Sequence, residues 1–143
     1  MSMYPNSKPK MASLLYESDK GDASGASEFI TRLLHGSTVI HMHHLMITGP
    51  GSFAKHSALD VYNELASLTD GLAEAYMGCT GQALVFGGGT FTMNGDCVAE
   101  VQALYEYVET ARSAMGSESH IQNEIDGIAT LLSSVLFKLN RLA

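Results

Sequence analysis

Residues 41–74 read HMHHLMITGPGSFAKHSALDVYNELASLTDGLAE, and this stretch decides how the chain folds. It carries four histidines and four carboxylates across two predicted helices, which a Gly-Pro-Gly turn at 49–51 joins. Such side chains are costly inside a helical bundle unless they bind something. A cluster of imidazoles and carboxylates suits a transition metal such as iron or zinc. The stretch therefore predicts two adjoining helices that present metal-ligand side chains.

The composition bounds the kind of molecule. A chain of 143 residues predicts one domain. Charged residues make up only 16% of the chain, which suggests that other subunits cover part of its surface. The formal net charge is −7 and the eight basic residues are scattered, so nucleic-acid binding by phosphate neutralisation is not expected.

The same composition gives an expectation for the compartment. No apolar run reaches transmembrane length, and no secretion signal is visible. Cys79 and Cys97 are therefore expected to be reduced thiols. We expect a protein of the cytoplasm, or of a virus particle, with no membrane partner.

Hydrophobic periodicity predicts four helices, over about residues 25–47, 53–77, 96–115 and 118–141. The links within the first and second pairs are short, whereas residues 78–95 form a long crossover that is either a small hairpin or an irregular apolar loop. This pattern predicts an all-α four-helix bundle with ferritin-like connectivity.

The bundle is expected to span residues 24–143, after an N-terminal tail over residues 1–23. The tail holds one apolar island, MASLLY at 11–16, which we expect to dock on the bundle or on a neighbouring copy.

Residues three or four apart on a helix share a face. Three pairs of candidate ligands follow this spacing: His41 with His44, His56 with Asp60, and Asp70 with Glu74. A di-iron bundle uses Glu-x-x-His elements, and none occurs here. A metal site at the centre of one bundle is therefore not expected, and a second subunit could supply the remaining ligands.

The remaining polar residues have simpler interpretations. We expect His35 to be structural and His43 to lie at the surface or at an interface. Glu100, with Glu106 and Glu109, is expected to form a solvated face.

The segment resembles the signature of Dps-type miniferritins. That family has a His near the end of its first helix, a Gly-containing turn, a second His twelve residues later, and a carboxylate four residues on. A Tyr follows, and an Asp-x-x-x-Glu lies eight residues past it. The matching positions here are His44, Gly49, His56, Asp60, Tyr62, Asp70 and Glu74. Small phage-encoded ferritin-like proteins are also similar.

The resemblance implies a metal site between two-fold related subunits. One chain would give His44, His56 and Asp60, and its partner would give Asp70 and Glu74. His41 would be an extra ligand or a supporting donor. The implied function is oxidation and sequestration of ferrous iron by a symmetric homo-oligomer, with peroxide or oxygen as oxidant. Zinc suits the same ligands almost as well.

The chain also departs from the family pattern. Asp60 and Asp70 are ten residues apart, where the family has eleven, and Leu45 and Ala75 replace a Trp and an Arg. These departures leave an alternative open. The bundle is then a non-enzymatic structural or assembly protein, for example of a phage particle, rather than a ferroxidase-type oxidoreductase.

Overall fold

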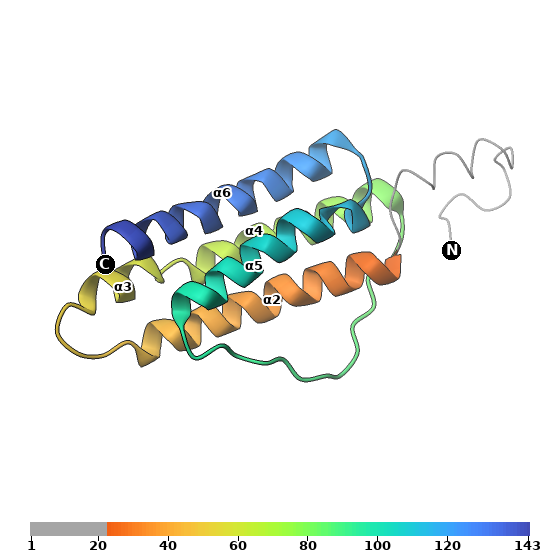
Figure 1. The fold of residues 1–143 in the computed structure, drawn as a ribbon. Coiled ribbons are helices and arrows are strands. Elements are labelled where there is room, and N and C mark those ends of the chain that lie inside the picture. The colour runs from red at the N-terminus through yellow and green to blue at the C-terminus, as the bar shows by residue number, and fades with distance from the viewer. Residues whose placement is uncertain (1–22) are drawn as a thin grey trace, which may run out of the picture.

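The computed structural model describes residues 23–143, and the predicted tail, with its apolar island, lies almost wholly outside them. The described chain is a helical bundle, as predicted (Figure 1). Its elements are α2 (Ala23–Met46), α3 (Phe53–Ala58), α4 (Tyr62–Thr80), α5 (Cys97–Ala111), the 3-10 turn η1 (Arg112–Met115) and α6 (Ser119–Arg141). None of the residues in 23–143 forms a β-strand, so the hairpin alternative for the crossover is wrong.

The core lies between α2, α4, α5 and α6, which pack against one another. The apolar stripe of α6 recurs every three or four residues, and six of its members are buried. They are Ile121, Ile125, Ile128, Leu132, Val135 and Leu139. Leu142 follows the last residue of α6 as its C-cap and is exposed.

Helices α2 and α5 approach closely where α2 carries a glycine. A Cβ atom built on Gly36 would lie 2.6 Å from Cδ2 of Leu104. The missing side chain therefore makes room for Leu104, and the helix accepts the modest cost of an internal glycine.

The predicted second helix, 53–77, is broken in two, which corrects the sequence prediction. The amide of Leu59 bonds to the carbonyl of Lys55, but the amide of Asp60 turns back to the carbonyl of Ser57. The chain restarts as α4 at Tyr62. The break places Asp60 outside α3, so His56 and Asp60 do not belong to one continuous helix, contrary to what the spacing predicts.

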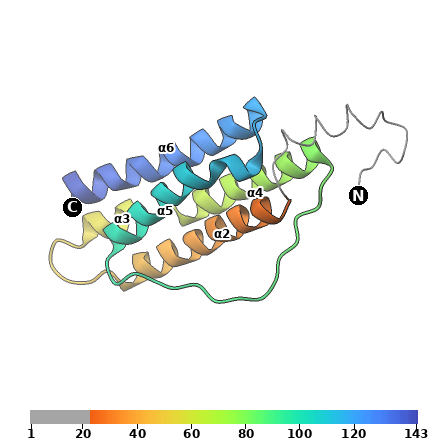
Figure 2. The same cartoon turned by 45° about the vertical axis from the view of Figure 1, so that its right-hand side comes forward.

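A long connecting segment, residues 81–96, joins α4 to α5. Gly81 ends α4 in the left-handed conformation (φ 70°), where glycine is favoured. Asp96 is the N-cap of α5, because its carboxylate accepts a hydrogen bond from the amide of Ala99 at 3.0 Å. Figures 1 and 2 show the segment running beside α2 from one end of the bundle to the other.

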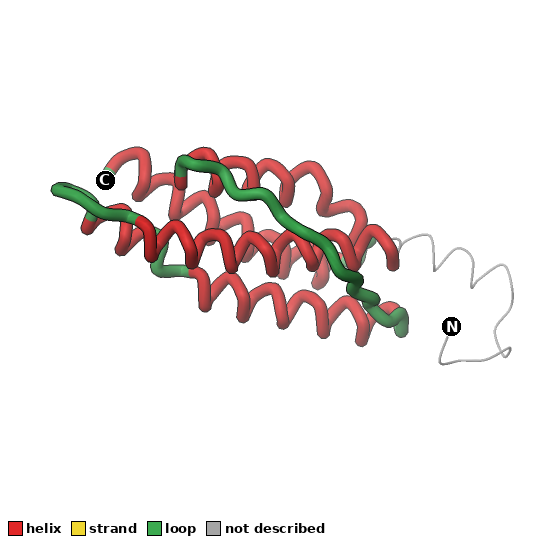
Figure 3. The backbone as a smooth tube through the Cα atoms, turned by 90° about the horizontal axis from the view of Figure 1, so that it is seen from below, coloured by secondary structure: helices red, strands yellow, loops and turns green. Residues whose placement is uncertain are grey.

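Seen from below, the connecting segment crosses the outside of the helices as a loop (Figure 3). Two contacts hold it to α2: the amide of Val85 donates to Oγ of Ser27 at 3.0 Å, and Phe91 packs on His35. At its far end the amide of Asn94 donates to Oε1 of Glu100 at 2.7 Å.

None of the helices in the described chain is long and apolar enough to cross a membrane.

Candidate metal centre

Two of the predicted ligands, His44 and His56, form a reciprocal pair at the end of α2. Nδ1 of His44 lies 2.8 Å from the carbonyl oxygen of His56, and Nδ1 of His56 lies 2.8 Å from the carbonyl oxygen of His44. Their rings stack, with centroids 3.7 Å apart and planes 22° apart. The pair joins the end of α2 to α3.

The pairing follows from where the helices end. The last carbonyls of a helix have no amide four residues on, and they need another donor. Helix α2 ends at Met46, which frees the carbonyl of His44. The break after α3 sends the amide of Asp60 to Ser57, which frees the carbonyl of His56. Each histidine therefore caps the helix end of the other.

The caps fix the tautomer of both rings. A carbonyl oxygen can only accept, so Nδ1 carries the proton in each histidine. In the neutral ring, Nε2 then holds a lone pair, which is the form that binds a metal. Neither Nε2 makes a hydrogen bond within residues 23–143, and no buried side-chain nitrogen or oxygen there lacks a partner. Each Nε2 atom therefore has some solvent-accessible surface, although His44 as a whole residue is only 7% exposed.

His41 and Tyr62 extend the pair into a histidine–tyrosine cluster, which comprises His41, His44, His56 and Tyr62. The rings of His41 and Tyr62 stack at 3.7 Å with planes only 7° apart, and His41 lies 6.4 Å from His44 between ring centroids. The hydroxyl of Ser37 donates to the carbonyl of Tyr62 at 2.8 Å, which holds the start of α4 against α2. The cluster is thus built from α2, α3 and α4.

The predicted carboxylates do not join the cluster within one chain. Asp60, Asp70 and Glu74 are exposed, and no group of three or more potential ligands that could hold a metal occurs in the part of the chain that the structure describes. Asp70 lies eight residues beyond Tyr62, about 12 Å along α4, and Glu74 lies about 6 Å further. The described residues of one chain therefore do not assemble the full predicted ligand set.

His43 and Glu100 correct two further predictions. His43 is only 2% exposed, and its Nε2 lies 3.4 Å from Oε1 of Glu100. The prediction of a solvated face for Glu100 is incomplete, because its carboxylate also accepts the amide of Asn94. The two residues lie 57 positions apart, so helical spacing gives no signal for this pair. His35 packs on Phe91, with ring centroids 4.6 Å apart.

Two groups away from the cluster have raised pKa values. Burial, and next the negative charge of Asp96, raise the pKa of the Cys97 thiol. Burial, and next the charge of Glu28, raise the pKa of Tyr107, while Arg32 acts in the opposite sense. Both groups are therefore held in their protonated forms, which gives neither one nucleophilic character.

Comparison with known families places this bundle among proteins whose role is open. The model of DUF5856, a family of unknown function, matches residues 44–139, about two thirds of the chain. The chain therefore belongs to this family. No curated protein and no solved structure matches it.

Proposed function

We propose that the protein binds ferrous iron between two copies of the chain and oxidises it. The observation that carries this proposal is the pair His44 and His56, because their reciprocal caps leave an unprotonated Nε2 on each of two stacked rings. Neutral imidazoles with carboxylates suit Fe(II). The net charge of −7 also attracts cations to the surface.

The stacking of the two rings favours two ions over one. The lone pair of each Nε2 lies in its own ring plane, and the planes are only 22° apart at a centroid distance of 3.7 Å. Lone pairs that lie in two stacked ring planes do not readily converge on a single ion. Each histidine would thus hold one ferrous ion, and carboxylates would complete both coordination spheres.

The carboxylates would come from both copies. Asp60 follows α3 in the same chain, and the exposed pair Asp70 and Glu74 on α4 would come from the second copy. Their exposure supports this, because a partner can reach them. His41 would act as an extra ligand or would support the pair through its stack on Tyr62.

A site with two ferrous ions suits a two-electron oxidant such as hydrogen peroxide. Two ferrous ions lose one electron each, and hydrogen peroxide accepts both as its O–O bond breaks to give two hydroxide ions. The residues of the chain hold the ions, balance their charge and orient them. Zinc would suit the same ligands but undergoes no oxidation, so the redox step distinguishes the two metals.

The fold is in keeping with this proposal. A long connection between α4 and α5, with short links elsewhere, is the arrangement that a ferritin-like bundle requires. In such bundles the helices are rigid supports for metal ligands, and here α2 and α4 would play that part.

The test uses exposed residues, so that a loss of binding does not reflect a loss of folding. We would prepare Asp70→Asn and Glu74→Gln, add ferrous iron anaerobically, and measure bound metal and the rate of oxidation by peroxide. Both variants should lose saturable binding. Glu64→Gln is the matched control, because Glu64 is exposed on the same helix and loses the same charge. Unchanged binding in both variants would refute the proposal.

A second candidate is an assembly role without chemistry, such as a component of a phage particle. Large apolar side chains are exposed at the end of the bundle where α2 ends, α3 lies and α6 ends (Figure 1). Phe53 is 82% exposed and Leu45 is 67% exposed. Such a patch indicates a protein–protein contact. Phe53→Ser should then reduce assembly in sedimentation experiments while metal content stays negligible in the parent protein.

A further inference from the structure

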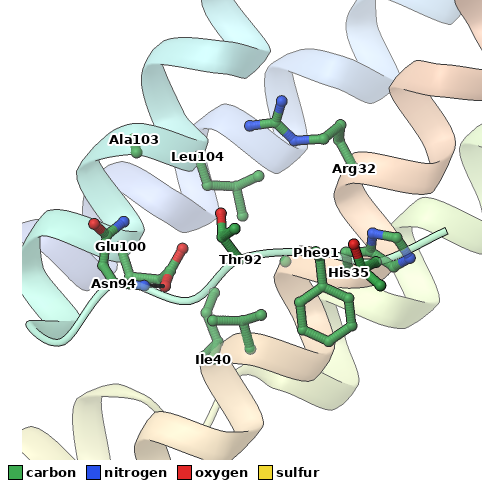
Figure 4. A pocket seen from close by; sticks show the side chains of 12 residues that line it. Arg32, His35, Ile40, Phe91, Thr92, Asn94, Glu100, Ala103 and Leu104 are labelled. Carbon is green, nitrogen blue, oxygen red and sulfur yellow. Dashed lines mark hydrogen bonds between the residues drawn. The ribbon is translucent and has the colours of Figure 1, made fainter.

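A cavity of about 430 Å³ lies between α2, α5 and the connecting segment. Figure 4 shows the segment passing between side chains of the two helices, with Thr92 beside Leu104. The volume falls in the range of small-molecule sites. The cavity shares no residue with the histidine–tyrosine cluster, so its use is independent of the proposed iron chemistry.

The lining is apolar in the middle and carries charge or hydrogen-bonding groups at both ends. Val39, Ile40 and Leu104 form the apolar part. Arg32 and His35 lie one turn apart at one end, and Glu100 lies at the other, beside His43. His35 and His43 are eight residues apart on α2, so the two ends are separated by about 12 Å.

The charged group at each end of the cavity can form a further ion pair or hydrogen bond. The guanidinium of Arg32 lies 4.0 Å above the ring of Tyr107, and Arg32 forms no salt bridge within residues 23–143. At the other end, the amide of Asn94 and Nε2 of His43 both approach Oε1 of Glu100. Within the same described region, Oε2 of Glu100 makes no hydrogen bond. A ligand with an anionic end and a cationic end would satisfy both.

The connecting segment forms one wall of the cavity, and between its two ends its backbone groups lack backbone partners within residues 23–143. Between Gln82 and Gly95, no backbone group bonds to another backbone group of the described chain. Side chains hold the segment instead. Its backbone amides donate to Ser27, Thr80 and Glu100. Its own side chains Gln82 and Phe91 contact Tyr76 and His35. Backbone groups that lack backbone partners can pair with the backbone of an added peptide, as they do at the edge of a sheet. This favours a peptide over a fatty acid. A fatty acid bound to Arg32 would place its apolar tail against the carboxylate of Glu100.

We propose that this cavity binds a short extended peptide, with its carboxyl terminus at Arg32 and His35 and its amino terminus at Glu100. An extended chain rises about 3.3 Å per residue, so the separation of the two ends suits a peptide of about four residues. The apolar middle of the cavity would take aliphatic side chains, and the backbone of the connecting segment would pair with the peptide backbone.

The test uses the full chain and the tetrapeptide Ala-Leu-Leu-Ala in three forms: with free ends, N-acetylated, and C-amidated. Isothermal titration calorimetry should give saturable one-to-one binding of the free form. Acetylation and amidation should each weaken binding by about tenfold or more, because each removes one charge-assisted contact.

Two variants assign the ends. In Arg32→Gln, the free and amidated peptides should bind equally, and in Glu100→Gln, the free and acetylated peptides should bind equally. Glutamine at 100 can still accept the amide of Asn94, so the connecting segment keeps its anchor. Arg141→Gln and Glu64→Gln are controls, because both residues are exposed and lie outside the cavity.

The inference is overturned if the free peptide shows no saturable binding at millimolar concentration. It is also overturned if the two end modifications weaken binding of the Arg32 and Glu100 variants as they do for the parent protein. Loss of iron binding in the Asp70 and Glu74 variants would leave the peptide result unchanged, so the two proposals fail separately.

Discussion

His44 and His56 each donate Nδ1–H to the carbonyl oxygen of the other residue, at 2.8 Å in both directions. One pair of side chains thus ends α2 and secures α3, while keeping both Nε2 atoms unprotonated in the neutral rings. The structural role and the proposed metal role use different nitrogens of the same rings. The two roles can therefore be separated by substitution.

Replacing His56 by alanine should destabilise the bundle. The carbonyl of His44 would lose its donor and the ring stack would be lost, at a cost of about 1–3 kcal/mol. His56→Asn should retain much of the stability, because its amide nitrogen can take the place of Nδ1. Urea unfolding measures both. His120→Ala, at an exposed position, is the control, and an alanine variant at 56 as stable as the parent would contradict the capping role.

Two glycines of the helices should respond in opposite ways to alanine. A methyl group added at Gly127 in α6 would meet nothing within 4 Å, so Gly127→Ala should stabilise by about 1 kcal/mol. Gly36→Ala should lose this gain, because the methyl would meet Leu104 at 2.6 Å.

A double variant isolates the cause. In a Leu104→Ala background, Gly36→Ala should become stabilising, as Gly127→Ala is in the parent protein. Thermal or urea unfolding gives the four free energies. If Gly36→Ala stabilises the parent as much as Gly127→Ala does, α2 and α5 are not in the close contact described.

Stability should fall at alkaline pH. Burial raises the pKa of Cys97 above its ordinary value of 9.0 and that of Tyr107 above 10.0. The unfolded chain therefore loses these protons at lower pH than the folded chain does. The free energy of unfolding should be fully retained below about pH 9 and should decrease as the pH rises above it.

Tyr107→Phe removes one of the two groups from this dependence. The variant should lose less stability than the parent between about pH 9 and 11, as followed by urea unfolding in stepped buffers. An equal or steeper loss in the variant would show that Tyr107 is not held protonated by its surroundings.

Periodicity is enough to predict the helices that form the core. The stripe of α6 and the N-cap Asp96 are local features, and local spacing determines them. The break between α3 and α4 is not predictable in this way, because the donor that makes it tolerable, His44, lies twelve residues earlier on another helix. The pairing of His43 with Glu100 is equally non-local.

The residues of the candidate site could also be predicted from the sequence only in part. Sequence spacing indicates His44 and His56 as ligands, and the fold does bring them together. The same spacing predicts that His56 and Asp60 lie on one helix, but α3 ends before Asp60. Asp70 and Glu74 do share exposed positions on α4, but whether they meet the histidines depends on a second copy, which no pattern within one chain determines.

The most direct test of the shared site is complementation between two variants. His44→Asn/His56→Asn keeps the capping donors but removes both Nε2 atoms, and Asp70→Asn/Glu74→Gln removes the carboxylates. Each variant alone should be inactive in peroxide-driven oxidation of ferrous iron. Mixed and allowed to exchange subunits, they should recover activity at about one quarter of the sites, since one site of each mixed pair is intact. Mixtures that stay inactive although mixed oligomers form would contradict the account.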